Sequence, residues 1–292
     1  MELKRKEGKK LALRDGRTLG YAEYGDPKGK PLFYCHGFPA SRFEGELTAA
    51  AATETGLRII AADRPGFGES EFQPDRTLLG WADDISELAD ALGMDRFAIL
   101  GVSGGGPYAL ACARRIPRRL TSIGIVGSLG PLAGTRLLTE MRWPARLFFG
   151  LSRRSPALLR LVLENLLPFL RRQPSVTLKL LTIAAPAADR VVLARTEAKR
   201  ILAASMKEAF RGGVQGAITE LDLYSRPWGF APDEISQRVH LWHGAVDATV
   251  PPSHGRFLAA ALPHCRPSFV AGEGHFSLPL NHMEEILSVL SE

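Results

Sequence analysis

The sequence is poor in cysteine and has no long apolar run. Its 292 residues include three cysteines, Cys35, Cys112 and Cys265, with no CxxC pair. This usage excludes a disulfide framework and a zinc ribbon and favours a reducing compartment. No stretch approaches about 18 uninterrupted apolar residues, so no membrane-spanning helix is predicted. The charged N-terminus, MELKRKEGKK, has no signal-peptide pattern. We therefore expect a cytoplasmic protein.

The rest of the composition is that of an ordinary globular protein. It is 45% hydrophobic and 23% charged, and a chain of this length can bury a large core. The net charge of +6 is uneven, because residues 131–226 hold 13 Arg and 3 Lys against 7 acidic residues. Solvated faces of Arg-rich helices are the simplest explanation, and an anionic substrate or membrane surface is the alternative. No nucleic-acid-reading motif accompanies the charge, so no nucleic-acid partner is expected.

Short apolar runs alternate with helical patterns over most of the chain. A hairpin is predicted at residues 10–24, apolar strands at 32–35, 57–62, 97–102 and 120–126, and further strands at 239–242 and 267–271. Helices are predicted at 41–55, 77–92, 253–262 and 281–290. This alternation is typical of a parallel sheet with helices on both faces. Strand signals vanish after residue 130, so residues 131–230 are predicted to form a helical cap, with 1–130 and 231–292 as the core.

The segment Gly101-Val102-Ser103-Gly104-Gly105 matches the G-x-S-x-G pattern where a predicted strand meets a helix. A sharp turn there lifts the serine hydroxyl above the sheet, and small residues two places to either side permit the turn. Ser103 is therefore the candidate nucleophile. A serine hydroxyl needs a base to take its proton, and the base needs an orienting carboxylate.

Two later strand ends supply these partners. Asp247 follows the strand at 239–242, and His275 follows the strand at 267–271. Functional groups of open α/β sheets collect beyond the carboxyl ends of the strands, so we expect Asp247 and His275 to join Ser103. The backbone amides of Gly104, at a helix start, and Phe38, on the neighbouring loop, are the candidate oxyanion donors.

Five motifs in this order resemble those of the α/β-hydrolase fold family. They are HGFP at 36–39, DRPGFGES at 63–70, GVSGGG at 101–106, GAVDATVP at 244–251 and GEGHF at 272–276. The resemblance covers about residues 10–130 and 235–292. It implies a mostly parallel eight-stranded sheet with an antiparallel second strand, helices on both faces and a variable helical cap. It also implies a triad of Ser103, His275 and Asp247. Haloalkane dehalogenases and epoxide hydrolases of this fold carry Asp at the nucleophile position, so Ser103 argues against both.

This interpretation predicts a serine hydrolase that cleaves a small or medium carboxylic ester through an acyl-enzyme on Ser103, without a metal or organic cofactor. Thioester, amide and lactone substrates remain open. Hydrolysis of a C–C bond or cofactor-free peroxidation would use the same triad, and a non-catalytic receptor would use the same scaffold. The expected partner is a small molecule, anionic if the basic block recruits it; no oligomeric state is indicated. Candidate pocket residues are Phe67 and Phe276 beside the catalytic loops, and Trp143 and Trp228 in the cap.

Overall fold

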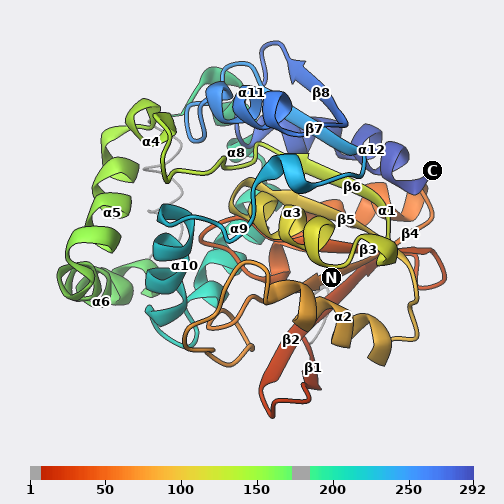
Figure 1. The fold of residues 1–292 in the computed structure, drawn as a ribbon, viewed down its shortest axis with the longest axis horizontal. Helices are drawn as coiled ribbons and strands as arrows, with labels where there is room; N and C mark the ends of the chain where they lie inside the picture. The colour runs from red at the N-terminus through yellow and green to blue at the C-terminus, as the bar shows by residue number, and fades with distance from the viewer. Residues whose placement is uncertain (1–7, 173–184) are drawn as a thin grey trace.

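The computed structural model describes residues 8–172 and 185–292 and is built around one eight-stranded sheet (Figure 1). The strand order is β1-β2-β4-β3-β5-β6-β7-β8. Strand β2 runs antiparallel to both neighbours, and all other adjacent pairs are parallel. The strands are β1 (Lys9–Ala12), β2 (Thr18–Gly25), β3 (Lys30–Cys35), β4 (Leu57–Ala62), β5 (Phe97–Val102), β6 (Leu120–Val126), β7 (Val239–Gly244) and β8 (Cys265–Val270). The predicted mostly parallel sheet with an antiparallel second strand is confirmed.

The apolar runs of the sequence form the centre of this sheet. All six positions of β5 are buried, because strands flank it on both sides and helices cover both faces. The rings of Phe33 on β3 and Phe97 on β5 lie 4.5 Å apart between centroids. Strands β1 and β2 form the predicted hairpin at the sheet edge, with Leu11 opposite Leu19. Its turn uses Gly16 at a φ of 87°, a conformation that glycine adopts without steric cost.

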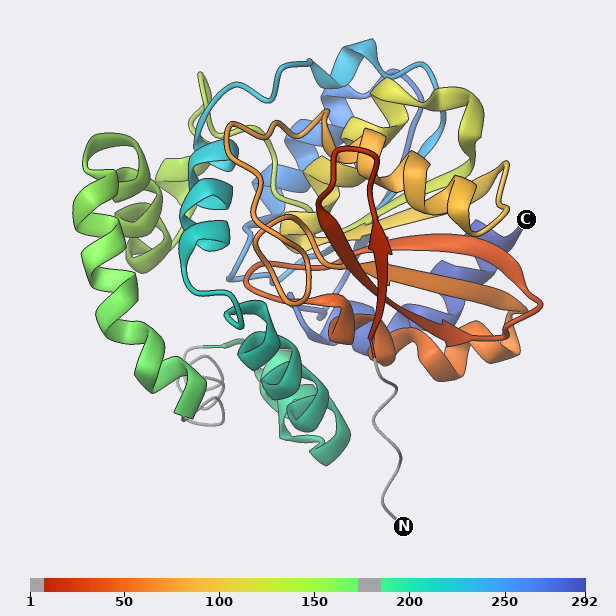
Figure 2. The same ribbon diagram turned by 90° about the horizontal axis from the view of Figure 1, so that it is seen from below.

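Two groups of helices cover the two faces of the sheet (Figure 2). On one face, Trp81 and Ile85 of α2 share a core with Phe97 of β5. On the other face, Ile286 and Leu287 of α12 share a core with Leu100 of β5. The covering helices are α1 (Ala49–Glu54), α2 (Trp81–Ala91), α3 (Gly106–Arg115), α11 (Pro252–Ala261) and α12 (Ser277–Ser291).

Between β6 and β7 the chain forms helices, which we call the helical segment (residues 131–230). Its described parts contain no strand. They contain α4 (Leu137–Glu140), α5 (Trp143–Arg154), α6 (Pro156–Arg172), α8 (Ala187–Ala194), α9 (Thr196–Ala209) and α10 (Gln215–Ser225). The segment meets the core beside the carboxyl end of β5, where the Tyr224 hydroxyl lies 2.8 Å from the Gly104 carbonyl oxygen. The division into a core and a cap as separate domains stays a prediction.

Helix boundaries depart from the predicted ones where local contacts intervene. The predicted helix at 77–92 begins only at Trp81, because residues 77–80 form a turn in which Gly80 N donates to Thr77 Oγ1 at 3.0 Å. The predicted helix at 41–55 is a 3-10 helix followed by α1. Short 3-10 helices are η1 (Arg42–Thr48), η2 (Ser103–Gly105), η3 (Pro117–Arg119) and η4 (Pro232–Glu234). None of the helices within the described ranges is both long and apolar enough to cross a bilayer.

Candidate active site

Ser103 lies on a strained turn at the carboxyl end of β5. Its φ is 54°, in the left-handed region that side-chain-bearing residues seldom adopt. A Cβ at Gly105 would lie 2.0 Å from the carbonyl oxygen of Cys35, and one at Gly101 would lie 2.5 Å from that of Gly105. Only glycine fits at these two positions. The two glycines permit the sharp turn that places the half-buried Ser103 at the edge of the sheet.

The structure brings Ser103, His275 and Asp247 into one hydrogen-bonded series. Nε2 of His275 lies 2.9 Å from Oγ of Ser103, and Nδ1 lies 2.7 Å from Oδ2 of Asp247. The other oxygen of Asp247 accepts hydrogen bonds from the backbone N–H groups of Thr249 and Val250, each at 2.8 Å. These bonds fix the carboxylate, which in turn fixes the ring and the tautomer that leaves Nε2 free to accept a proton.

The environment distinguishes His275 from the other buried histidines nearby. Burial acts to lower the pKa of His275, but the charge and hydrogen bond of Asp247 outweigh it, so the pKa lies above its ordinary value. Burial lowers the pKa of His36 and of His243 instead. Among these three rings, His275 is the one whose protonated form is stabilised, which a general base needs.

Hydrogen bonds to two carbonyl groups set the orientation of the Phe38 and Gly104 N–H groups, because each carbonyl belongs to the same peptide unit as one of these N–H groups. The carbonyl of Gly37 accepts from Arg64 Nη2 at 2.9 Å, and that of Ser103 accepts from Leu129 N at 3.3 Å. Because N–H and C=O oppose each other across a trans peptide, these bonds orient the N–H groups of Phe38 and Gly104. Neither N–H donates to another group within residues 8–172 and 185–292.

A buried ionic cluster from the helical segment supports this loop. Glu220 of α10 lies 2.5 Å from Arg64 Nη2 and 2.8 Å from Arg76 Nη2. The hydroxyl of Tyr224 lies 2.5 Å from Glu220 and 2.8 Å from the carbonyl of Gly104. Burial would raise the pKa of Glu220, but the charges of the two arginines prevail and lower it to about 2. The ionised carboxylate therefore holds Arg64, whose Nη2 donates to the carbonyl of Gly37, in the peptide unit that carries the Phe38 N–H.

A second buried acid, Asp189 of α8, holds the loop that carries the histidine. Its carboxylate accepts from the backbone N–H groups of His275 at 3.0 Å, Phe276 at 2.9 Å and Ser277 at 2.8 Å. These amides open α12, where an anionic group also complements the helix dipole. The contact explains why α12 begins at Ser277, four residues before the predicted start.

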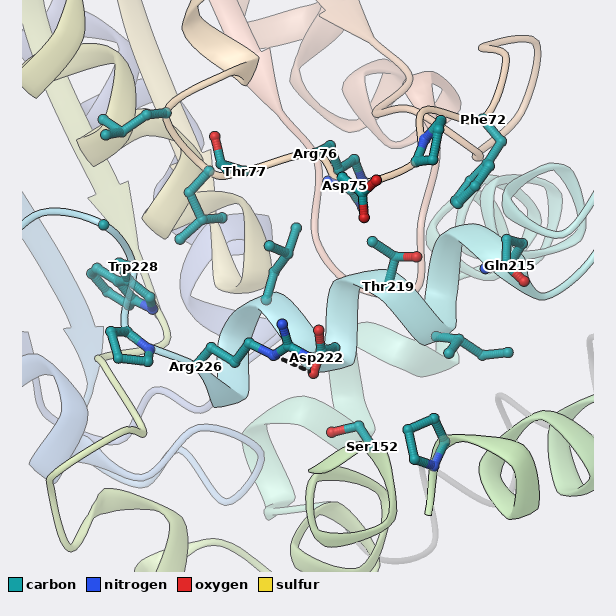
Figure 3. Close-up of a pocket in the computed structure, with 18 residues that line it drawn as sticks. Phe72, Asp75, Arg76, Thr77, Ser152, Gln215, Thr219, Asp222, Arg226 and Trp228 are labelled. Atoms are coloured by element: carbon teal, nitrogen blue, oxygen red, sulfur yellow. Dashed lines mark ion pairs between the residues drawn. The ribbon is translucent and has the colours of Figure 1, made fainter. Parts of the chain in front are cut away.

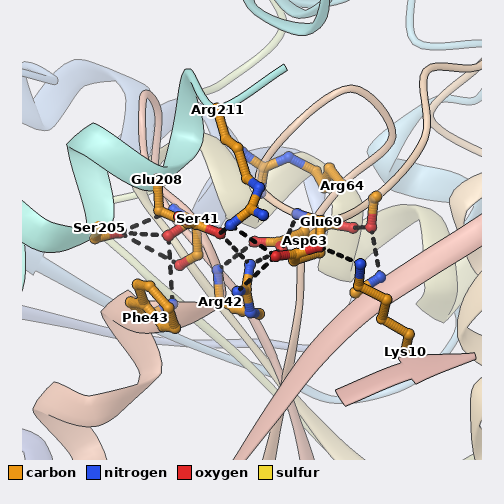
Figure 4. Close-up of polar contacts among 12 residues, drawn as sticks. Lys10, Ser41, Arg42, Phe43, Asp63, Arg64, Glu69, Ser205, Glu208 and Arg211 are labelled. Carbon is orange, nitrogen blue, oxygen red and sulfur yellow. Dashed lines mark hydrogen bonds and ion pairs between the residues drawn. The ribbon is translucent and has the colours of Figure 1, made fainter. Parts of the chain in front are cut away.

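Helix α9 is anchored to the core as well (Figure 4). The hydroxyl of Ser205 accepts from Ser41 N at 2.9 Å, and Glu208 lies 2.9 Å from Arg42 Nη1. Arg42 Nη1 also donates to the buried Asp63 at 2.5 Å. Three helices of the helical segment, α8, α9 and α10, thus each contact a core loop through buried polar groups.

Two cavities meet at Ser103. The larger, about 330 Å³, is lined mostly by apolar side chains: Phe38, Pro39, Leu129, Met141, Ala145, Phe148, Phe149, Leu163, Leu166, Phe210, Ala217, Leu221 and Val250, with Ser103, Gly104, Tyr224 and Thr249. The smaller, about 170 Å³, lies on the side of His275, which lines it together with Phe276, Leu280 and Glu44. Neither lining contains a lysine or an arginine.

Of the four aromatic residues predicted to line a pocket, one does so beside Ser103. Phe276 lines the smaller cavity. Phe67 is 1% exposed and packs edge-to-face against Phe38, with the ring centroids 6.3 Å apart. Trp143 begins α5 facing outward and is 73% exposed. Trp228 lines a separate groove of about 680 Å³ beside α10 (Figure 3). The latter three therefore lie outside both cavities.

Sequence reasoning missed Asp189, Glu220 and Glu44. A signal exists for Asp189, because apolar Val192 and Leu193 follow three and four residues later, which predicts that the acid lies on the buried face of a helix. An acid at such a position is rarely buried without a partner. The sequence carries no comparable signal for Glu44. Within the described ranges, no group of three or more His, Cys, Asp or Glu side chains is placed to hold a metal ion.

The chain resembles known proteins both in sequence and in structure. A family model described as the alpha/beta hydrolase fold matches residues 30–281. A non-heme chloroperoxidase from Streptomyces lividans is 31% identical over 125 residues, 42% of this chain and 45% of that protein. Lipase 1 from Psychrobacter immobilis is 32% identical over 127 residues, 42% and 39% respectively. The chain spans less than half the length of these two curated relatives.

Among solved structures, a thermophilic esterase from Thermogutta terrifontis has the same fold. The TM-score is 0.67 at 21% identity, covering 97% of this chain and 96% of that chain. At this identity the likeness concerns the fold alone. The family model, in contrast, spans most of the sequence, including the strand-turn-helix around Ser103 and the loops of Asp247 and His275. This protein therefore belongs to the alpha/beta hydrolase fold family.

Proposed function

We propose that the protein is a serine hydrolase that cleaves a carboxylic ester through an acyl-enzyme on Ser103. The supporting observation is the series of contacts from Asp247 through His275 to Ser103, at 2.7 and 2.9 Å, beside two amide N–H groups that donate to no group in the described part of the chain. A hydroxyl in such a series transfers its proton to the imidazole as it attacks.

The reaction has two halves. Oγ of Ser103 attacks the ester carbonyl carbon while its proton moves to Nε2 of His275, and the amides of Phe38 and Gly104 bind the oxyanion. His275 then gives the proton to the alcohol oxygen, the C–O bond breaks and the acyl group stays on Ser103. Water next loses a proton to His275 and attacks the acyl carbon. Ser103 recovers that proton as the carboxylic acid leaves.

The cavities favour an ester with an apolar acyl group and without an anionic group. The alcohol oxygen must receive a proton from His275, so the alcohol belongs on the side of the smaller cavity, which His275 lines. The acyl chain then occupies the larger, mainly apolar cavity. An anionic substrate, which the basic block suggests, would find no cationic side chain in either lining.

A fluorophosphonate probe and a panel of p-nitrophenyl esters of graded chain length test the proposal. We expect strong labelling of the wild type, no labelling of Ser103→Ala and ester hydrolysis that the same substitution removes. A folded wild-type protein that neither reacts with the probe nor hydrolyses any ester would overturn the proposal and favour the receptor alternative.

Peroxidation is a second candidate, because the Streptomyces relative carries a chloroperoxidase name. In this reaction hydrogen peroxide replaces water, attacks the acyl carbon on Ser103 and releases a peracid. Measuring peracid formation from a carboxylic acid and hydrogen peroxide, with Ser103→Ala as control, tests this candidate. A peracid rate that equals the Ser103→Ala background would exclude it.

A further inference from the structure

Glu44, in η1, places a carboxylate in the wall of the smaller cavity. The residue is 7% exposed. Its Oε2 accepts from Gly37 N at 2.7 Å, and its Oε1 accepts from the hydroxyl of Tyr34 at 3.3 Å. A Cβ built on Gly37 would lie 3.3 and 3.4 Å from the two carboxylate oxygens and 3.6 Å from Cβ of Ser103. The carboxylate and the nucleophile therefore border the same small space.

This carboxylate keeps unused hydrogen-bonding capacity. Each oxygen has two lone-pair sites, and each accepts a single bond from the described chain. Burial raises the pKa of Glu44, although the Gly37 hydrogen bond and the positive charge of Arg64 act against this. A buried anion with a cavity on one side gains more from a hydrogen-bond donor than from the apolar lining around it.

The position of Glu44 decides which half of the substrate it meets. His275 and Phe276 line the smaller cavity and are absent from the lining of the larger one. Because His275 must protonate the departing oxygen, the alcohol half of the ester lies on the side of Glu44. The acyl half lies on the opposite side of Ser103, against apolar side chains.

We infer that Glu44 is a specificity-determining residue that binds a hydrogen-bond donor, a hydroxyl or an ammonium group, on the alcohol half of the substrate. The inference rests on the proposed ester hydrolysis at Ser103. The cavity of about 170 Å³ has room for about five or six water-sized groups, so the alcohol is small. The substrate class is an ester of an apolar acid with a small polyhydric or amino alcohol. An alcohol bearing a carboxylate is repelled by Glu44.

Esters of octanoic acid with matched alcohols test the inference. The 2-hydroxyethyl ester is compared with its isostere, the n-propyl ester, and the 2-(dimethylamino)ethyl ester with the 3-methylbutyl ester. Each pair differs at one donor group. We expect the wild-type kcat/KM to be higher for the donor-bearing member by about tenfold for the hydroxyl and up to about a hundredfold for the ammonium group.

The variant Glu44→Gln keeps a carbonyl acceptor but removes the charge. We expect both kcat/KM ratios to fall toward one, the ammonium ratio by the larger factor. Glu46→Gln is the matched control, because Glu46 lies on the same element but pairs with Arg200 on the surface at 2.6 Å. It should leave both ratios unchanged. Ratios are compared because they do not depend on how much active enzyme each preparation contains.

The outcomes separate this inference from the proposed function. Wild-type ratios at or below one would overturn the role of Glu44 even if Glu44→Gln does not fold, while hydrolysis of the n-propyl ester would leave the proposed function standing. Ratios unchanged in a folded Glu44→Gln protein would overturn it as well. If Ser103 reacts with neither probe nor ester, the proposed function fails and the inference falls with it.

Discussion

The carboxylate of Asp189 lies 3.0 Å from the backbone nitrogen of His275, although 86 positions separate them in the chain. The contact joins α8 of the helical segment to the loop that carries the proposed base. Through the same carboxylate, α8 also holds the first amides of α12. The position of the imidazole therefore depends on a residue that lies outside the strand-and-helix core.

Replacing Asp189 by Asn should impair catalysis more than substrate binding. The side-chain amide of Asn keeps one oxygen acceptor, but its NH2 group faces backbone N–H groups that need an acceptor. The His275 loop should therefore shift. We expect kcat to fall about tenfold or more with a smaller change in KM, because small misplacements of reacting groups are costly. The free energy of unfolding should fall by about 1–3 kcal/mol. Steady-state kinetics and urea unfolding measure both.

The control for this variant is Asp222→Asn, which removes a more exposed acid of the helical segment that pairs with Arg226 at 2.8 Å. Its effect on unfolding should stay within about 0.5 kcal/mol. If Asp189→Asn kept the wild-type kcat and pH profile, the positioning role of Asp189 would be refuted.

Replacing Glu220 by Gln should weaken both stability and catalysis. The substitution leaves Arg64 and Arg76 buried without their counter-charge, and breaking a buried pair costs about 3–5 kcal/mol. Loss of the support for Arg64, which binds the Gly37 carbonyl, should lower kcat by up to about a hundredfold to a thousandfold, the range for a lost oxyanion donor. Thermal unfolding and kinetics test this, and a kcat equal to that of the wild type would contradict it.

The stability that Glu220 contributes should depend on pH. The folded-state pKa of about 2 lies below the ordinary 4.5. The contribution is therefore fully present above about pH 4.5 and is lost as the pH falls toward 2. Its size is on the order of 3 kcal/mol. We expect the difference in unfolding free energy between the wild type and Glu220→Gln to shrink over this window, as urea titrations at several pH values would measure. A constant difference would contradict the assigned pKa.

The pH dependence of turnover should report His275. Because its pKa is raised mainly by Asp247, wild-type kcat/KM should fall on the acidic side as the imidazole takes a proton at a pH above the ordinary value of 6.5. Asp247→Asn should move this limb to lower pH and reduce kcat by about ten-thousandfold. A pH–rate profile of both proteins tests the shift, and an unmoved acidic limb would argue against the assignment.

The larger cavity predicts a preference among acyl chains. Ala145 of α5 lines it, so Ala145→Phe should shorten the space and shift the best substrate to a shorter chain. The exposed Ala157 of α6 supplies the control Ala157→Phe, which should leave the optimum unchanged. A series of p-nitrophenyl esters measures the optimum for each variant. An unchanged optimum in Ala145→Phe would place the acyl chain elsewhere.

The strands and the elbow could be predicted from the sequence because local signals specify them. The runs 97–102 and 120–126 become β5 and β6 with the predicted ends, since continuous apolar residues bounded by turns favour a buried strand. Ser103 stands between glycines that the turn requires, and the loops of Asp247 and His275 follow strand ends. Chain order and strand alternation were sufficient to place these three residues at one sheet edge.

The residues that support them could not be predicted in the same way. Glu220 and Asp189 contact core residues from helices of the helical segment, and the packing of those helices is set by tertiary contacts. The local pattern indicates that Asp189 is buried, but it does not indicate which core residues Asp189 or Glu220 contacts. Trp143, in contrast, was predicted to line the substrate pocket and does not. An aromatic residue in an amphipathic helix suggests a buried face, yet it lies at the outer start of α5 and is 73% exposed.

The anchoring of α8, α9 and α10 restricts the route that a ligand takes to Ser103. Moving these three helices away from the core together would break the contact of Asp189 with the His275 backbone and that of Glu220 with Arg64. Such a movement would therefore remove the support of the loops that flank Ser103. Helix α5 contacts α10 through the hydroxyls of Ser152 and Ser225, 3.2 Å apart, and through the rings of Phe149 and Tyr224, whose centroids lie 6.5 Å apart. Under the proposed ester hydrolysis, the acyl chain should therefore reach Ser103 without displacement of α8, α9 or α10.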